Sequence, residues 1–546
     1  MNRNSLLKVL SVFLALGMLV SYIPVDATAK TAVSQQTVTV DNAILDEIDK
    51  NGVATYWVDF TNSADLSKAY FMDWSERGWY VYETLKEQAE KTQSAAVAYL
   101  EATGVEYQSF WIANRILVKQ SNNSVLSGLQ QLPNVVSISA QKTYTLYEPE
   151  KVSVSDETKG IEPNIAHVLA PEAWDLGFDG AGLVVANIDT GVRYTHQALV
   201  GQYRGNNGDG TFNHNYNWLN PVTASDNVPR DGNGHGTHTM GTMVGDDGGS
   251  NQIGIAPGAE WMACAGCPDG TCPDAALLGC GEFVTAPTDL AGNNADPDMR
   301  PNVVNNSWGD CSTSYDDWYA DVVDAWQAAG VYPVFSNGNN SNCGYPAPPG
   351  LNTVGNPGRY GNVTGVGSSG TANGQYASHS NWGPTDNLDT INPVVGFAMM
   401  KPQVIAPGVS IRSSIPTSDT SYQGGWSGTS MSAPHVTGLV AMIMQAAPCL
   451  VGDYSTIETI LESTATHITY NDGSPLTPTD YPNFASGWGE INAQAAVQLA
   501  SGMCGNSVLY GTVTSDSAAP IPGAKIVITG TDTANNRTVY TNASGQ

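Results

Sequence analysis

Basic residues are scarce in this chain of 546 residues. Lys and Arg together number 22 against 51 Asp and Glu, which gives a formal net charge of -29. Nucleic acids and anionic membrane surfaces are bound through clustered Lys and Arg side chains, so we expect neither as a partner. The length allows two to four domains and at least one large core. The composition is typical of a soluble, secreted protein.

Long apolar runs are absent after the first 20 residues. The one early run, Val9 to Val20, is shorter than the roughly 20 residues that a membrane-spanning helix needs. Arg3 and Lys8 form a basic start, and Ala27-Thr28-Ala29 has the small-residue pattern of a cleavage site. We therefore predict a signal peptide over residues 1–29 and no membrane span in the mature chain. A retained N-terminal anchor is the alternative.

Cysteine is also sparse, and its number is even, as expected for disulfides in an exported chain. Four of the residues cluster within 17 positions, at a spacing where four thiolates could instead bind zinc. Both interpretations stay open, and the spacing does not define the pairs. The eight residues are Cys264, Cys267, Cys272, Cys280, Cys311, Cys343, Cys449 and Cys504.

Residues 30–150 predict a small α+β domain. Strands are expected at 53–60, 109–118 and 135–140, and helices at 78–102 and 124–132. Elements in this order pack their helices on one side of an antiparallel sheet. The polar residues 141–163 that follow are predicted to form an exposed linker with a processing site.

A second pattern begins near residue 160, where short apolar strands alternate with helices. This alternation is typical of a parallel α/β sheet. Strands are expected at 183–188, 302–309 and 331–339, and a buried helix at 436–444. Functional sites in such sheets form outside the carboxyl ends of the strands. Asp189 follows the first of these strands directly.

Three residues in this unit have the chemistry of nucleophilic catalysis. Ser430 precedes the buried helix, whose N-terminus favours the negative charge that develops during attack on a carbonyl. A serine hydroxyl needs a base such as His235, and an imidazole needs a carboxylate such as Asp189 to fix its tautomer. Each residue alone could equally be a helix cap or a polar loop residue, so the combination carries the prediction.

The sequence around these three residues resembles the signature blocks of the subtilisin-like serine peptidases, in the order Asp, His, Ser known for subtilisin. The likeness runs from about residue 160 to 500, and the histidine block is most similar to the bacillopeptidase F branch. It implies a subtilisin-like three-layer α/β catalytic domain with a mostly parallel sheet over residues 151–503. The blocks are Asp189-Thr190-Gly191-Val192, Gly234-His235-Gly236-Thr237-His238 and Gly428-Thr429-Ser430-Met431-Ser432-Ala433-Pro434.

The resemblance also implies a role for each residue. Asp189 would orient His235, which would serve as general base and then acid, and Ser430 would be the nucleophile. Asn339 matches the oxyanion-hole asparagine, which works together with the backbone N–H of Ser430. Asn337, two residues earlier, is the alternative assignment. The likeness requires no cofactor and no catalytic metal.

A primary specificity pocket is implied by the same likeness. No Asp or Glu occupies its matched base, so we expect apolar or aromatic side chains to be preferred, although Asp310 beside one wall leaves Lys and Arg open. The substrate-binding residues would be Ser307, Trp308, Gly309, Ser336, Asn337, Gly338 and, at the base, Gly355.

The flanking regions resemble accessory parts of this family. Residues 30–150 resemble a ferredoxin-like inhibitory propeptide, so the chain's own propeptide is an expected partner beside protein or peptide substrates. By that likeness residues 141–160 would lie through the active site. Residues 504–546 predict strands and resemble the start of a carboxypeptidase-regulatory-like β-sandwich. We expect the sequence to be truncated there, which leaves attachment to the cell surface beyond Gln546 open.

Structural calcium is common in this family, but no complete ligand pattern is present. Asp209 in a glycine-rich loop, and the neighbouring Asp246 and Asp247, could supply oxygen ligands. A solvated acidic loop is the alternative for each.

The sequence therefore favours a secreted serine endopeptidase that acts through an acyl-enzyme and is made as a self-processing zymogen. A catalytically silent peptide-binding protein would normally lack a triad residue, and none is missing. An acid peptidase of the sedolisin type would use carboxylates in place of His235. A surface-adhesion protein would depend mainly on the C-terminal strands.

Overall fold

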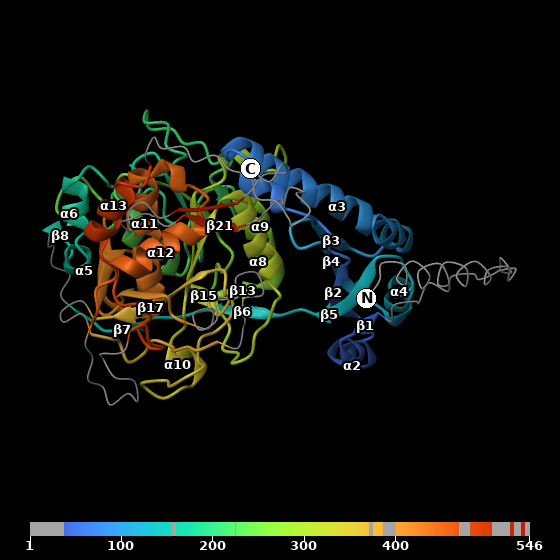
Figure 1. Ribbon diagram of the computed structural model, residues 1–546. Coiled ribbons are helices and arrows are strands. Elements are labelled where there is room, and N and C mark those ends of the chain that lie inside the picture. Colours follow the sequence, from blue (N-terminus) through green and yellow to red (C-terminus); the bar gives the residue numbers. More distant parts are fainter. Residues whose placement is uncertain are drawn as a thin grey trace, which may run out of the picture. The chain divides into compact units, whose positions relative to one another are not determined.

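The protein is described from a computed structural model (Figure 1). The structure describes residues 38–154, 160–223, 225–370, 375–385, 400–468 and 481–504, and the strands at 525–528 and 537–540. The predicted signal peptide at 1–29 lies outside the described residues. The chain divides into two units, Met1–Thr39 and Val40–Gln546, and every described helix belongs to the second. Among the helices of the described part, none combines the length and apolar character needed to cross a bilayer.

The N-terminal region is an α+β unit, as predicted. Its five-stranded sheet has the order β1-β5-β2-β4-β3, and the central strand β2 pairs antiparallel with both neighbours. The strand expected at 109–118 is instead two antiparallel strands, since Asn114 turns the chain with a φ of 49°. The strands are β1 (Thr39–Val40), β2 (Ala54–Phe60), β3 (Tyr107–Phe110), β4 (Arg115–Ser121) and β5 (Val135–Ala140).

Three helices accompany this sheet: α2 (Asn42–Asn51), α3 (Trp74–Thr103) and α4 (Asn123–Leu129). The longest, α3, begins where the Asp73 side chain accepts a hydrogen bond from the Glu76 N–H, and ends at Gly104 in the left-handed conformation. These are typical start and stop signals. Its buried residues include Val81, Leu85, Ala89, Ala96 and Leu100, spaced four or seven apart as on one helix face.

The catalytic region is built on a seven-stranded sheet in which every pair is parallel. Successive residues face opposite sides of the sheet; Val185 belongs to one core and Ala186 to the other. The order is β10 (Trp218–Leu219), β12 (Glu260–Cys264), β9 (Val184–Ile188), β14 (Val303–Asn306), β16 (Tyr332–Ser336), β17 (Thr364–Ser369) and β18 (Val404–Pro407).

Helices cover both faces of this sheet, which gives the predicted three-layer α/β fold (Figure 1). On one face lie α7 (His235–Val244), α11 (Thr429–Ala446) and α13 (Ala493–Ser501), and on the other α8 (Asp274–Thr285) and α9 (Ala320–Ala329). Helix α3 packs against α9, so residues of the N-terminal region join the hydrophobic core on the side of the sheet that α8 and α9 cover. The remaining helices are α5 (Pro163–His167), α6 (Ala170–Asp175), α10 (Asn340–Cys343) and α12 (Tyr454–Thr464).

The prediction of an exposed linker at 141–163 is wrong for the first half of that segment. Residues 143–146 form strand β6 (Thr143–Leu146), and the side chains of Tyr144, Leu146 and Tyr147 are buried. Strand β6 pairs antiparallel with β13 (Thr271–Pro273) on one side and β15 (Trp308–Gly309) on the other. These side chains are buried because β6 pairs with strands more than 100 positions away in the sequence. The polarity of the local sequence does not show such pairing.

A second short strand follows, and residues 150–154 are exposed. Strand β7 (Glu150–Lys151) pairs antiparallel with β20 (Tyr422–Ser427), whose other neighbour is β19 (Ile411–Ser414). Two further short strands, β8 (Gly160–Ile161) and β11 (Asn251–Gln252), pair parallel with each other.

All eight cysteines form disulfides, as expected, and the zinc alternative is wrong. The pairs are Cys264–Cys280, Cys267–Cys272, Cys311–Cys343 and Cys449–Cys504. In the C-terminal segment, two predicted strands are present as the antiparallel pair β21 (Lys525–Ile528) and β22 (Arg537–Tyr540). A further predicted strand, over residues 508–514, lies outside the described residues.

Candidate active site

Asp189 and His235 meet at the carboxyl end of strand β9. Asp189 follows the strand directly, and His235 begins helix α7 after Gly234, whose φ of 106° turns the chain into the helix. The Nδ1 atom of His235 lies 2.8 Å and 3.0 Å from the two carboxylate oxygens of Asp189. A carboxylate only accepts hydrogen bonds, so Nδ1 carries the hydrogen and Nε2 of the neutral ring is left as an acceptor.

The surroundings of His235 raise its pKa above the ordinary value. Burial alone would lower it, because a buried imidazole loses the hydration of its charged form. The Asp189 carboxylate beside the ring outweighs this effect, and the charges of Glu148 and Asp231 act in the same direction. Both the His235 and the Asp189 side chains are 0% exposed, so their pairing is little screened by solvent.

Ser430 lies in the first turn of helix α11 and directs its hydroxyl towards a peptide carbonyl of the same chain. Its Oγ donates a hydrogen bond of 2.8 Å to the carbonyl oxygen of Tyr147 and a longer one of 3.3 Å to that of Ser307. Within the described residues, no hydrogen bond joins Ser430 to His235, and the buried His235 Nε2 has no partner. Helices α7 and α11, which carry the two residues, pack against each other.

Asn339 contacts the same carbonyl oxygen. Its Nδ2 donates to Tyr147 O at 3.2 Å and, more weakly, to Glu148 O at 3.4 Å. Its Oδ1 accepts hydrogen bonds from the backbone N–H and the hydroxyl of Thr429, at 2.8 Å and 2.9 Å. These bonds fix which end of the amide faces the carbonyl. The alternative residue, Asn337, instead donates to Asn381 O at 3.2 Å.

The Tyr147 side chain fills a pocket that closes around its ring. Its exposed fraction is 1%, and its phenol donates a 2.7 Å hydrogen bond to the backbone carbonyl of Asp310. A methyl group added to Gly309 or Gly355 would lie 2.2 Å or 2.3 Å from the phenol oxygen, and one on Gly338 would lie 3.2 Å from the ring. Three of the predicted pocket glycines therefore line this space.

The other predicted pocket residues contribute differently. Ser307 accepts a 3.4 Å hydrogen bond from the Tyr147 N–H through its carbonyl. Trp308 holds strand β6 by its backbone, while its indole packs edge-on against Tyr144 and Tyr319 in the core. The Ser336 hydroxyl is buried without a hydrogen-bond partner among the described residues.

The carboxyl group of Asp310 points to other partners. It accepts hydrogen bonds from the N–H and side-chain amide of Asn356 and from the Ser312 N–H, at 2.8–3.2 Å. Burial raises the pKa of Asp310. Its backbone carbonyl, rather than its charge, is therefore what the pocket offers to the ring inside it.

Asp231 is a site residue that was not predicted from the sequence. Its buried carboxylate connects the histidine block to the aspartate block. One oxygen accepts hydrogen bonds from the Thr190 hydroxyl at 2.9 Å and from the Gly234 N–H at 2.7 Å. The other oxygen accepts from the N–H and the hydroxyl of Thr237, at 2.8 Å and 2.7 Å. The signal in the sequence was weak, because Asp231 lies four positions before the first helical residue and Gly234 occupies the N-cap position.

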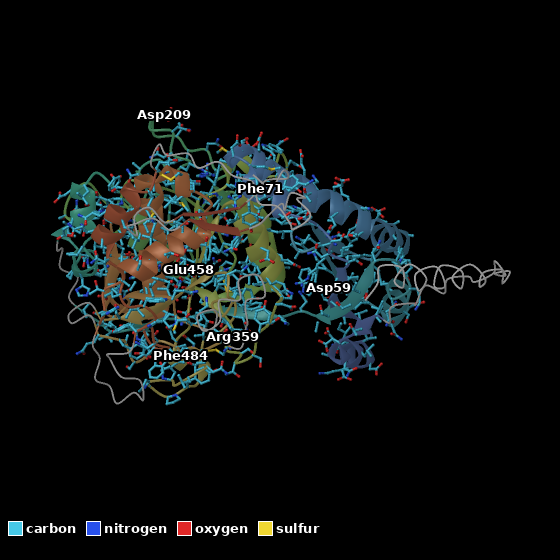
Figure 2. All side chains as sticks on the ribbon, in the orientation of Figure 1. Asp59, Phe71, Asp209, Arg359, Glu458 and Phe484 are labelled. Atoms are coloured by element: carbon cyan, nitrogen blue, oxygen red, sulfur yellow. A yellow bond between two sulfur atoms is a disulfide. The ribbon has the colours of Figure 1, made fainter. Side chains whose placement is uncertain are left out.

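The calcium candidates do not gather into a common site. Asp209 lies on an outlying loop, where its carboxylate accepts hydrogen bonds from Thr211 (Figure 2). Asp246 and Asp247 accept from the N–H groups of Gly248 and Gly249. Across the described part of the chain, no three His, Cys, Asp or Glu side chains form a metal-binding group. These residues do not fit a complete calcium site, and calcium binding stays a prediction.

Comparison with known proteins places this geometry in a family. The model of the subtilase family matches residues 180–489. Bacillopeptidase F of Bacillus subtilis (strain 168) is 37% identical over 81% of this chain, which spans 30% of that protein's length. A subtilisin of Bacillus pumilus is 30% identical over 61% of this chain and 98% of its own length.

A solved structure supports the fold. Fervidolysin from Fervidobacterium pennivorans, described as a keratinolytic enzyme related to subtilisin, superposes with a TM-score of 0.56 at 20% identity. The match covers 90% of this chain and 68% of fervidolysin. The predicted fold class, and the predicted likeness to the subtilisin-like peptidases and to the bacillopeptidase F branch, are thereby confirmed.

Proposed function

The chain belongs to the subtilase family, and on that premise we propose that it is a secreted serine endopeptidase made as a self-processing zymogen. One observation carries the proposal. The Tyr147 carbonyl oxygen accepts hydrogen bonds from both Ser430 and Asn339, beside a buried Asp189–His235 pair. A nucleophile and a polarising amide thus face one peptide carbonyl, and the base with its orienting carboxylate lies at the start of a helix that packs against the helix of the nucleophile. These are the groups that acyl transfer requires.

The catalytic roles follow from the donors and acceptors. His235, with Nε2 free to accept, takes the proton of the Ser430 hydroxyl as that oxygen attacks a substrate carbonyl. Asp189 holds the ring through Nδ1 and stabilises the imidazolium. His235 then gives the proton to the leaving amine, and water hydrolyses the resulting ester in the reverse sequence of proton transfers.

Charge on the attacked oxygen needs donors in place before the reaction. Asn339 supplies one, and its direction is set by Thr429 in the block that carries the nucleophile. The Ser430 backbone N–H, at the start of helix α11, is the predicted second donor. Asp231 acts as a positioning residue, because it fixes the turn that presents His235.

The N-terminal region serves as the inhibitory propeptide in this proposal. Its packing on helix α9 and the entry of β6 between β13 and β15 support that role, because a strand held there excludes other peptides. The substrate-binding residues are the seven predicted ones, of which Gly309, Gly338 and Gly355 surround the bound side chain. Substrates are proteins or peptides with an aromatic or apolar side chain before the cut bond.

A fluorophosphonate probe tests this function, since it reacts only with an activated serine. We expect the processed chain to be labelled and the Ser430→Ala variant to be neither labelled nor processed. The variant should still fold, because a methyl group replaces a hydroxyl. A secreted, folded wild-type chain that stays unlabelled at neutral pH would favour a catalytically silent peptide-binding protein. Labelling and turnover only at strongly acidic pH would favour an acid peptidase.

A further inference from the structure

We propose that the Tyr147–Glu148 peptide bond is the bond that this enzyme cuts in itself, and that the pocket selects tyrosine at the cut through its phenol. The inference rests on the proposed function and names its processing site and the side chain it reads. It places the cut three residues before the predicted end of the propeptide at residue 150.

The carbonyl group identifies the bond. Among the described residues, the Tyr147 oxygen accepts hydrogen bonds from both the Ser430 hydroxyl, at 2.8 Å, and the Asn339 amide, at 3.2 Å. Within the described part of the chain, the next carbonyl, that of Glu148, accepts a hydrogen bond only from Asn339, at 3.4 Å. The Ser307 carbonyl also accepts from Ser430, at 3.3 Å, but the Tyr147 carbonyl is the one that accepts from both the nucleophile and the amide. We therefore assign the attack to the Tyr147 carbonyl carbon and the cut to the bond on its C-terminal side.

The backbone on both sides holds this bond in register. Before it, strand β6 pairs with β13 and β15, and the Tyr147 N–H donates to Ser307 O. After it, strand β7 pairs with β20, and the Val152 N–H donates to Gly425 O at 3.0 Å. A slip by one residue would bring a different carbonyl to Ser430 and would move Tyr147 out of the pocket.

The phenol supplies the selectivity. Burial raises the pKa of Tyr147 well above its ordinary value, so the phenol stays protonated and donates to Asp310 O at 2.7 Å. A phenylalanine ring would fit the same space but leave this carbonyl without its donor. A site built to hydrogen-bond a hydroxyl discriminates against the analogue that lacks it, because a buried polar group is then left unpaired.

The cut proceeds by acyl transfer. The Ser430 oxygen bonds to the Tyr147 carbonyl carbon as its proton moves to His235 Nε2. The C–N bond to Glu148 then breaks, and that proton goes to the departing nitrogen. In the second step, water gives one proton to His235 as its oxygen bonds to the carbonyl carbon of the Tyr147 ester. The ester bond to the Ser430 oxygen then breaks, and that oxygen takes the proton back from His235. The products are a Tyr147 carboxylate and a Glu148 amine, and no redox partner is needed.

Mass spectrometry of the processed full chain tests the bond directly. We expect the released N-terminal fragment to end at Tyr147, whatever later trimming the other product undergoes. A fragment that ends at any other residue in an active, probe-labelled enzyme would overturn the assigned bond and leave the proposed function standing. No cut in a folded chain that the probe does not label would instead indicate failure of the proposed function.

Variants at Tyr147 test the selectivity. Tyr147→Phe should slow cutting about tenfold, in line with a lost hydrogen bond to a buried group, and Tyr147→Ala should slow it by a factor of about 100 or more because the ring is also lost. Thr145→Ala, an exposed position on the same strand, is the matched control and should cut at the wild-type rate. Equal rates for the wild type and Tyr147→Phe, with both fragments ending at position 147, would overturn the phenol's role.

Discussion

The two halves of the segment that crosses the active site are held very differently. Before the Tyr147 carbonyl, strand β6 has a partner strand on each side, and the side chains of Tyr144, Leu146 and Tyr147 are 2%, 2% and 1% exposed. After it, strand β7 pairs with one strand, β20, within the described residues, and Glu150 and Lys151 are exposed although Pro149 is buried. We call these the acyl half (residues 143–147) and the leaving half (residues 148–152).

This difference indicates the order of events after a cut. Burial of apolar surface contributes about 25 cal/mol per Å², so the acyl half keeps most of its binding free energy when the bond breaks. The leaving half loses its covalent link to the acyl half, and apart from the buried Pro149 its residues from Glu150 to Val152 are exposed, so less buried surface retains it. On the proposed function, we therefore expect the new amine to depart first, and we expect the N-terminal fragment to stay in place and inhibit the enzyme until it is removed.

Loss of the amide at the junction of the halves should have the largest effect. Asn339→Leu is expected to slow cutting by about 10²- to 10³-fold, a magnitude known from a subtilisin itself rather than one derived from this geometry. A time course of fragment release measures it. Asn342→Ala, an exposed residue that contacts Asn339 but not the carbonyl, should cut normally. Normal cutting by Asn339→Leu would remove Asn339 from the catalytic machinery.

Weakening the acyl half should come next. Leu146→Ala removes buried surface worth about 2 kcal/mol, which corresponds to roughly 30-fold faster loss of the cut fragment. The delay between cutting and the appearance of activity on an added peptide measures this loss. Thr145→Ala, the exposed neighbour on strand β6, should leave the delay unchanged. Equal delays in both variants would mean that burial does not retain the fragment.

The sequence predicted the parts of this site that local chemistry specifies. Strand β9 (Val184–Ile188) is largely apolar, so both its existence and the place of Asp189 at its end could be predicted directly. The helix after Ser430 was expected at 436–444 and spans Thr429–Ala446. Its first seven residues, 429–435, were not predicted as helix because they are mostly small or polar and include Pro434, which breaks the helical hydrogen-bond pattern.

The acyl half could not be predicted in the same way. Its residues alternate between polar and apolar, but both partner strands lie far along the chain, and a short polar stretch gives no sign of pairing with them. The role of Asp310 was also hidden, because a sequence shows its charge and not its backbone carbonyl. The orientation of Asn339 by Thr429 depends on a contact between residues 90 positions apart.

Neutralising the leaving half at Glu148 should change the pH dependence of cutting. The Glu148 charge helps to raise the pKa of His235, and His235 must be neutral to accept the serine proton. Glu148→Gln should therefore lower the pKa of His235, so that cutting persists to a lower pH. We expect the acid limb of the pH–rate profile to move down by on the order of half a pH unit. Initial rates of fragment release from about pH 5 to about pH 8, the range in which an imidazole titrates, measure the shift.

Glu150→Gln is the matched control for this profile, because Glu150 is exposed on strand β7 and is not among the charges that raise the pKa of His235. Its acid limb should coincide with that of the wild type. An upward displacement in Glu148→Gln would contradict the electrostatic link between the leaving half and the base.

The smallest effect is expected from Lys151, the last paired residue of the leaving half. Its ammonium group lies 3.9 Å from the centroid of the Trp426 ring, and an exposed cation–π contact of this kind contributes about 0.5–1 kcal/mol. Lys151→Ala should therefore slow cutting only about two- to fivefold, and Lys151→Arg, which keeps the cation, should restore the rate. A loss as large as that of an acyl-half variant would show that both halves are held with similar strength. The order of departure would then have to depend on strain in the bond rather than on unequal anchoring.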